Sequence, residues 1–355
     1  MAKTKVYPVA LALAILLSLH GYRKGSLAVS GALAAFTVGY LTLANPVSTF
    51  GTTLLFFYLV GSRATKVGSA TKAKLEREGE EKANHKSKQG GQRDAWQVFC
   101  NSATAVVASV LFRLLYVDDV SPALVPGFLK PHRHSITWQS GKRWCLLLVD
   151  DSTSLFPWLG DRTGAVAQGC FLAMLGHFAC CMGDTLASEL GILSRTSPRL
   201  ILPPFAKVPP GTNGGQSLVG TVAALAGGTL IGLFSGASLL FFDNAACQTR
   251  LAHGTSTALA KLVFLGSLAG LAGSTIDSLL GATLQRTWYN TASKQVLVGG
   301  RLPKHEQAKK GGSGSSGKWQ VITGRDVLSN NAVNLVSSVT TALLTVVVGR
   351  LLFSQ

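Results

Sequence analysis

Long apolar blocks, separated by shorter polar segments, follow one another along the whole chain. Eight of them have about the length of a membrane-spanning helix: roughly 6–22, 26–44, 49–62, 95–117, 164–182, 216–242, 256–284 and 327–353. A helix needs roughly 20 residues to cross a hydrocarbon core of about 30 Å, so the third block is short for a span. The pattern predicts an all-α fold, a polytopic transmembrane helical bundle of about eight spans, with residues 1–355 as one integral membrane domain.

The composition favours a membrane protein over a soluble or a nucleic-acid-binding one. Hydrophobic residues make up 47% of the chain and charged residues only 14%, whereas soluble domains have about 25% charged residues. The net charge of +17 comes mainly from Lys and Arg between the apolar blocks, where membrane topology accounts for it without nucleic acid. Six cysteines form no metal-binding pattern, so we expect buried, reduced side chains rather than a disulfide framework.

The basic residues also predict an orientation. If segment 63–94 faces the cytoplasm, the segments on the same side are 23–25, 183–215 and 285–326. Together these four hold 22 Lys and Arg, against 8 on the opposite side. The positive-inside rule favours this orientation, although Lys3 and Lys5 count against it. The endoplasmic reticulum or another endomembrane is the default location.

Three long polar segments predict loops. We expect flexible basic loops at 63–94 and 285–326, and an extended loop at 118–163. Residues 312–318, GSGSSGK, have the spacing of a phosphate-binding Gly-rich loop, but Trp319 follows where Ser or Thr would bind magnesium, and no apolar strand precedes. This stretch is therefore predicted to be a linker, and it gives no support to a soluble nucleotide-binding domain.

Polar side chains recur with helical spacing on three of the predicted spans. They lie on one face of each helix: Ser274, Asp277, Ser278, Gly281 and Gln285 in the seventh, Asn330, Asn334, Ser337, Ser338 and Thr341 with Asn331 beside them in the eighth, and Arg93, Gln97, Asn101 and Thr104 in the fourth. Polar residues in spans often only hydrogen-bond between helices. Three stripes that begin near one membrane surface instead predict a polar cavity open to the cytoplasmic side, with helix packing as the alternative.

The stretch VPPGTNGGQSLVG, residues 208–220, joins a Gly-rich loop to the start of an apolar helix. Gly residues let backbone N–H groups turn toward an anion, and a helix N-terminus adds a favourable dipole. The stretch predicts a phosphate-binding loop. A simple turn into a membrane span is an equally good interpretation.

Acidic residues at membrane depth are costly and indicate function. Gly183 is expected to break the fifth span, so that Asp184 either caps the following helix or binds a ligand. Capping explains neither Glu189 nor Asp277, and three carboxylates around one cavity repel each other unless a cation lies between them. We therefore predict Mg²⁺ as a cofactor. The neighbouring cations, typical of a phosphoryl-transfer site, are Lys86, Lys88, Arg93, Arg195 and Arg199.

Several of these motifs occur together in a fixed order: MGDTLASELGILS, SPRLI, VPPGTNGGQSLVGT, GSTIDSLLGATLQ and VLSNNAVNLVSS, preceded by Lys88, Gly91, Arg93, Gln97 and Asn101 of KQGGQRDAWQVFCN. In them the chain resembles the integral membrane family called domain of unknown function 92. The resemblance covers nearly the whole chain except the low-complexity loops and about 118–160. The chain departs from the family at Leu186, where relatives usually have Trp, and in its enlarged 118–163 loop. Neither departure removes a candidate ligand.

That family includes animal transmembrane protein 19 and a plant phytyl-phosphate kinase. The element GDTLASELG is also similar to a motif of dolichol kinase and phosphatidate cytidylyltransferase, which use CTP. The resemblance implies a membrane-embedded prenyl monophosphate kinase that transfers a phosphoryl group from a nucleoside triphosphate, CTP being the first choice, to form a prenyl diphosphate. The expected partners are the lipid bilayer and these two substrates, without nucleic acid. The oligomeric state is not predicted.

Roles can be assigned to the residues on this hypothesis. The catalytic set is Asp184, Glu189 and Asp277, as magnesium ligands, with Arg93 and Lys88 as neutralising charges. The substrate or nucleotide contacts are Gly211, Thr212, Asn213, Gly214, Gly215, Gln97, Asn101, Ser188, Ser278, Asn330, Asn331 and Asn334. The lipid tail is expected between the Gly-rich sixth and seventh helices. The alternatives are a transporter of a phosphorylated lipid or ion, and a non-catalytic structural membrane protein.

Overall fold

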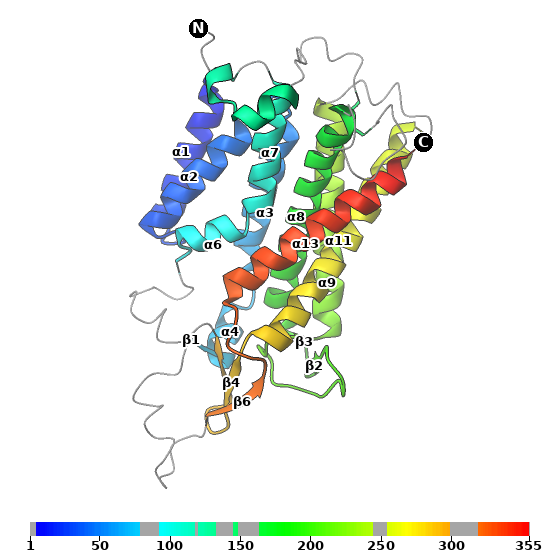
Figure 1. The fold of residues 1–355 in the computed structure, drawn as a ribbon. Helices are drawn as coiled ribbons and strands as arrows, with labels where there is room; N and C mark the ends of the chain where they lie inside the picture. Colours follow the sequence, from blue (N-terminus) through cyan, green and yellow to red (C-terminus); the bar gives the residue numbers. More distant parts are fainter. Residues whose placement is uncertain are drawn as a thin grey trace.

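The computed structural model is an elongated helical molecule with a small β-sheet at one end (Figure 1). It describes residues 5–78, 92–117, 120–132, 145–147, 163–243, 254–298 and 319–354. The helices are α1 (Pro8–Arg23), α2 (Val29–Leu43), α3 (Ser48–Ala64), α4 (Ser69–Leu75), α6 (Ala95–Cys100), α7 (Ala103–Tyr116), α8 (Thr163–Gly191), α9 (Leu218–Ala237), the π-helix η5 (Ser238–Asp243), α11 (Gly254–Leu284) and α13 (Asn330–Phe353). Two short 3-10 helices follow α7: η1 (Pro122–Leu124) and η2 (Gly127–His132).

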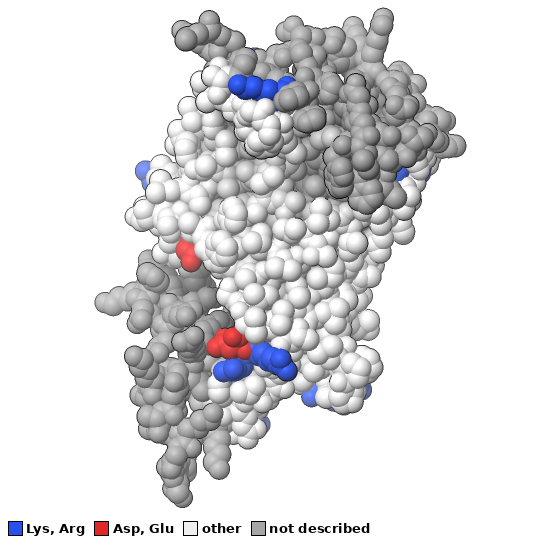
Figure 2. Space-filling model, viewed as in Figure 1, with Lys and Arg blue, Asp and Glu red and all other residues white. Residues whose placement is uncertain are grey.

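Helices occur at all eight predicted spans, and the predicted all-α polytopic membrane fold is confirmed. Among the described residues, four helices are long and apolar enough to cross a membrane: α8, α9 continued by η5, α11 and α13. Shorter apolar helices are α1, α2 and α7. Figure 2 shows a broad uncharged belt, with most of the charged side chains visible on this face near its ends. This distribution is typical of a protein whose middle lies in a bilayer.

The predicted span 95–117 is two helices rather than one. α6 ends just before Asn101, α7 begins just after Ser102, and α6 lies across the end of α7 in Figure 1. The side chains of Asn101 and Ser102 donate hydrogen bonds to the carbonyl oxygens of Gln97 (2.8 Å) and Val98 (2.8 Å), respectively. These bonds satisfy carbonyl groups at the end of α6, so the two polar side chains favour a break there.

The central helix of the bundle is α8. It contacts α3, α7, α9, α11 and α13, and its large side chains, including Phe171, Leu175 and Phe178, are fully buried. α8 continues without interruption through Gly183 to Gly191. The predicted break at Gly183 is therefore wrong, and Asp184 does not cap a new helix.

Gly183 instead permits a close helix crossing. A Cβ atom on Gly183 would lie 2.6 Å from the carbonyl oxygen of Gly270 in α11, and one on Gly270 would lie 2.7 Å from Cα of Gly228 in α9. Small residues allow such backbone contact in membranes, where hydrophobicity does not drive helices together. We call Gly183, Gly227, Gly228 and Gly270 the glycine crossing. It leaves no room for a lipid tail between α9 and α11, so that expectation is wrong.

Much of the two predicted flexible loops is ordered. A four-stranded sheet of order β1-β5-β4-β6 joins them, formed by β1 (Glu76–Glu78), β4 (Thr287–Asn290), β5 (Gln295–Val298) and β6 (Trp319–Thr323). β1 is parallel to β5, whereas β4 is antiparallel to both β5 and β6. The loop prediction failed because short strands leave little periodic signal and gain stability only by pairing. A second, two-stranded sheet pairs β2 (Arg199–Leu200) with β3 (Gly215–Gln216).

Most described cysteines follow the prediction. Cys100, Cys170, Cys180 and Cys181 are free and buried. Cys145 is disulfide-bonded, contrary to the expectation of reduced side chains. It lies between α7 and α8, outside the apolar helices, where the argument from burial in a span does not apply.

Replacing Gly270 with Ala should destabilise the bundle, because the added Cβ would lie 2.7 Å from Gly228 Cα and 2.8 Å from the Ala224 carbonyl oxygen. We expect a loss of about 1–3 kcal/mol, as for other overpacked interiors, measured as a lower thermal unfolding midpoint in detergent. Gly61→Ala in α3 is the matched control, because nothing lies within 4 Å of its added Cβ. It should unfold at or above the parent temperature, since Ala favours helix. Equal midpoints for the two variants would contradict the close crossing.

Candidate functional site

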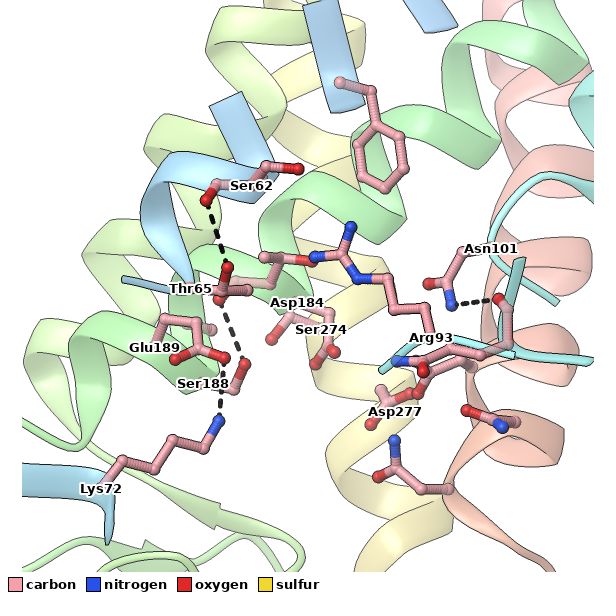
Figure 3. A pocket seen from close by; sticks show the side chains of 18 of the residues that line it. Ser62, Thr65, Lys72, Arg93, Asn101, Asp184, Ser188, Glu189, Ser274 and Asp277 are labelled. Atoms are coloured by element: carbon pink, nitrogen blue, oxygen red, sulfur yellow. Dashed lines mark hydrogen bonds and ion pairs between the residues drawn. The ribbon is translucent and has the colours of Figure 1, made fainter. Parts of the chain in front are cut away.

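A cavity of about 2420 Å³ lies between the α1–α2 hairpin, α3, α4, α6 and the ends of α8, α11 and α13 that are nearest the β-sheet. The loop that precedes α9 closes part of it. Its polar end gathers side chains from α3, α4, α8 and α11 and from the segment before α6 (Figure 3). This is the end at which the three predicted polar stripes begin.

Every predicted site residue in the described part of the chain lines this cavity. The residues are Arg93, Gln97, Asn101, Asp184, Ser188, Glu189, Gly211, Thr212, Asn213, Gly214, Gly215, Asp277, Ser278, Asn330, Asn331 and Asn334. Lys88 lies outside the described residues. The deeper stripe members Ser337, Ser338 and Thr341 are buried between helices. The stripes thus serve both predicted purposes, a polar cavity at one end and helix packing farther along.

Two carboxylates face the polar end from adjacent helices, Asp184 on α8 and Asp277 on α11 (Figure 3). Both are partly buried, and their charges interact. The Ser337 hydroxyl donates to Asp277 Oδ2 at 3.1 Å. The Asn334 amide, with its nitrogen turned toward these acceptors, donates to the same oxygen at 3.2 Å. In the part of the chain that the structure describes, neither carboxylate has an ion-pair partner, so the pair offers oxygen ligands to a cation.

Glu189 does not join this pair. Its Oε1 atom lies 2.8 Å from Lys72 Nζ in α4, and the residue is only 7% exposed. The five-residue separation places it about 140° around α8 from Asp184. No group of three or more His, Cys, Asp or Glu that could hold a metal occurs among the described residues. The expected three-carboxylate site is therefore reduced to Asp184 and Asp277.

Lys72 is paired with Glu189 and acts electrostatically on Asp184. Burial alone would lower the pKa of its ammonium group, but the negative charges of Glu76, Glu189 and Asp184 outweigh burial and raise the pKa above its ordinary value. Lys72 therefore stays protonated at neutral pH. It neutralises Glu189 directly and contributes positive potential at Asp184.

Arg93 is held at the same end by the backbone. Its N–H donates to the Ser26 carbonyl oxygen at 3.1 Å, and its own carbonyl accepts from Ala28 N at 3.0 Å, which ties it to the α1–α2 turn. Burial lowers the pKa of its guanidinium, which is still charged at physiological pH. Of the other predicted cations, Lys86 lies outside the described residues, whereas Arg195 and Arg199 are outside the cavity lining.

The Gly-rich loop is docked on α11 rather than open to an anion. A Cβ on Gly214 would lie 2.7 Å from the Ser278 carbonyl oxygen. The N–H groups at positions 212, 213 and 215 donate to protein acceptors: Pro209 O (3.2 Å), Thr287 Oγ1 (3.3 Å) and Thr212 O (2.9 Å), respectively. These donors are already used, so the expected phosphate cradle does not form from them, and the loop serves as a wall of the cavity.

The contribution of α3 and α4 was not predicted. Tyr58 and Ser62 on α3, Thr65 just after its end and Lys72 on α4 line the cavity. The spacing of Tyr58, Ser62 and Thr65 is helical and could have shown a fourth polar stripe. The pairing of Lys72 with Glu189, 117 residues apart, has no local signal.

The Lys72–Glu189 pair should stabilise the packing of α4 on α8. We expect Glu189→Gln to cost about 1–3 kcal/mol, because it leaves a partly buried cation without its acceptor, measured as a lower thermal unfolding midpoint. Because the pKa of Lys72 is raised in the folded protein, this stabilisation is present at neutral pH and disappears as the pH rises through that raised value. Lys74→Gln, an exposed change on the same helix, is the control. A pair with no structural role would leave both variants at the parent midpoint.

Comparisons with known proteins agree with this membrane architecture. The model of a family described as integral membrane protein DUF92 matches residues 12–342. The chain is 33% identical to Protein PGR of Arabidopsis thaliana over 342 residues, which cover 95% of this chain and 94% of the relative. It is 39% identical over 117 residues, 32% of this chain and 41% of the relative, to an uncharacterized membrane protein of Methanocaldococcus jannaschii. No solved structure matches. The family expected from the motifs is confirmed: this chain belongs to the integral membrane family DUF92.

Proposed function

We propose that this chain is a membrane-embedded prenyl monophosphate kinase that uses a nucleoside triphosphate, with CTP as the first to test. One observation carries the proposal: Asp184 and Asp277 share the polar end of a cavity with Lys72 and Arg93, and the same cavity extends between apolar helices. Carboxylates and cations together suit phosphates, and an apolar extension suits a lipid. The motif resemblance described above supports the same activity. In the proposed orientation the polar end faces the cytoplasm.

The carboxylate pair fits the proposed Mg²⁺ cofactor. Magnesium is commonly held by one or two carboxylates together with substrate phosphates and water, and Asp184 and Asp277 are two such ligands on adjacent helices. The bonds that Ser337 and Asn334 donate to Asp277 fix that carboxylate. When bound, the ion would neutralise phosphate charge. Glu189 is better assigned to positioning Lys72.

The residues of the chain then position and neutralise the reactants. A phosphate oxygen of the prenyl monophosphate forms a bond to the γ-phosphorus, the bond from that phosphorus to the bridging oxygen breaks, and the nucleoside diphosphate leaves. Lys72 and Arg93 offset the negative charge that accumulates around the phosphates. The second pKa of a phosphate monoester is about 6, so the acceptor oxygen is already ionised at neutral pH. No general base is required.

Removing either carboxylate should abolish transfer. The parent protein in lipid nanodiscs, with Mg²⁺, geranylgeranyl or phytyl monophosphate and each of CTP, ATP, GTP and UTP, should yield the prenyl diphosphate by mass spectrometry. We expect Asp184→Asn and Asp277→Asn each to lower the rate by at least about 100-fold, in the range seen when one charge-stabilising group is lost. The thermal unfolding midpoint of each variant would be measured alongside.

Asp94→Asn is the matched control, because Asp94 lines the same cavity but its side chain caps α6 by accepting from Gln97 N at 2.8 Å. Asn caps helices as well as Asp does, so this variant should remain active. Binding of prenyl phosphate without nucleotide consumption by the folded parent would overturn the kinase and favour the transporter. An equal loss of activity in all three variants would argue against a special role of the carboxylate pair.

A further inference from the structure

One face of α3 changes from apolar to polar along its length. Leu54 and Phe57 line the cavity nearer the start of the helix, and Tyr58 follows them on α3. Thr65 lies just past the end of the helix, and the chain continues to Lys72. The helix rises about 16 Å from Leu54 to Thr65. A wall with this gradient matches an amphiphile whose anionic head lies at the Lys72 end and whose hydrocarbon tail runs along the apolar end.

The α1–α2 hairpin supplies further apolar lining for the same part of the cavity: Ala14 and Leu17 on α1, and Ala35, Val38 and Leu43 on α2. We call the space that these residues share with Leu54 and Phe57 the apolar arm. Leu16 and Leu59, which also line the cavity, are 62% and 44% exposed. The arm thus reaches the lipid-facing surface, and a lipid can enter it from the bilayer.

The far end of the apolar arm is closed by a contact between α2 and α3. A Cβ on Gly51 would lie 2.6 Å from Leu43 Cδ2 and 2.8 Å from Leu43 Cα, so Leu43 packs directly on the α3 backbone. Arg93 hydrogen-bonds with Ala28 at the start of α2, whereas Leu43 is the last residue of that helix. The 15 residues of α2 therefore separate the backbone of Arg93 from this contact by about 22 Å.

We propose that the apolar arm holds the isoprenoid tail of the substrate and that Leu43, packed on Gly51, sets the longest tail that fits. The identity of the head group rests on the proposed function. The placement of the tail rests on the gradient along α3, on the two cations at its polar end, and on the glycine crossing, which excludes a tail between α9 and α11.

Photolabelling tests the placement without any turnover. A prenyl monophosphate with a diazirine at the end of its tail would be bound to the full-length protein in nanodiscs, irradiated, and its adducts mapped by mass spectrometry. We expect adducts in residues 35–57, around Val38, Leu43 and Leu54. Adducts confined to α9 and α11 would overturn the placement, whether or not the protein is a kinase.

Filling the arm should discriminate against long tails. Val38→Trp is expected to weaken binding of geranylgeranyl monophosphate about tenfold or more, since excluding two methylene groups from an apolar site costs about that much. The same change should affect binding of the shorter geranyl monophosphate far less. Leu33→Trp is the matched control on α2, because Leu33 is 66% exposed and outside the cavity lining. Identical tail-length preference in the two variants would overturn the proposal.

Shortening Leu43 tests the end of the arm. Leu43→Ala should bind a prenyl monophosphate whose tail is one isoprene unit longer than the longest tail that the parent accepts, and bind it several-fold more tightly than the parent does. The two proteins should bind geranyl monophosphate with equal affinity. No gain for the longer tail would remove Leu43 from its proposed role. If these binding results hold but no diphosphate forms, the kinase fails and the tail site stands. If diphosphate forms with unchanged tail preference in Val38→Trp, the tail site alone fails.

Discussion

Contact between the backbones of α8, α9 and α11 determines where the polar groups of this bundle lie. At the glycine crossing no side chain separates the helices, so the backbones of α8 and α11 touch one residue before Asp184 and seven residues before Asp277. Ordinary side chains hold packed helices about 8–10 Å apart, so the crossing brings the two helices that carry these carboxylates closer together than usual. Gly183 lies one residue before Asp184. It was predicted to end the helix, but its physical role is to let a neighbouring helix approach.

Polar groups inside the bundle are tolerated because nearly every one has a local partner. Thr341 and Thr345 donate to carbonyl oxygens one turn earlier in α13. The Ser337 hydroxyl is within hydrogen-bond distance of both the Asn334 carbonyl oxygen in its own helix and the Asp277 carboxylate. Such bonds remove the cost of unsatisfied groups in a medium without water. The cavity begins where these internal bonds end and side chains of α8, α11 and α13 face open space. The same polar stripes therefore form the buried helix contacts at one end and line the cavity at the other.

The sequence predicted what depends on neighbours along one helix and missed what depends on distant partners. Apolar blocks located the helices, and polar spacing placed Asp277, Asn330 and Asn334 on cavity-lining faces. The sheet that joins β1 to β5, and the pair of Lys72 with Glu189, connect residues more than a hundred positions apart. The loop at 211–215 was left open between two interpretations for a related reason. Its glycines suit an anion and a tight turn equally well, and its docking on Ser278 and Thr287, which are distant along the chain, favours the turn.

The position of Glu189 changes the charge balance of the site. With Glu189 paired to Lys72, Asp184 and Asp277 remain as two carboxyl groups on the cavity wall that have no ion-pair partner among the described residues. Two carboxyl groups that share a cavity disfavour each other's charged form, and a cation between them relieves that repulsion. Arg93 carries a single positive charge and is tied by its backbone to the α1–α2 turn. On the proposed function, a phosphate would approach the carboxylate pair together with a divalent ion, as a nucleoside triphosphate bound to magnesium does. On the proposed function, the nucleotide and its metal would bind as one unit to α8 and α11, while the lipid phosphate approaches from the side of α3 and Arg93.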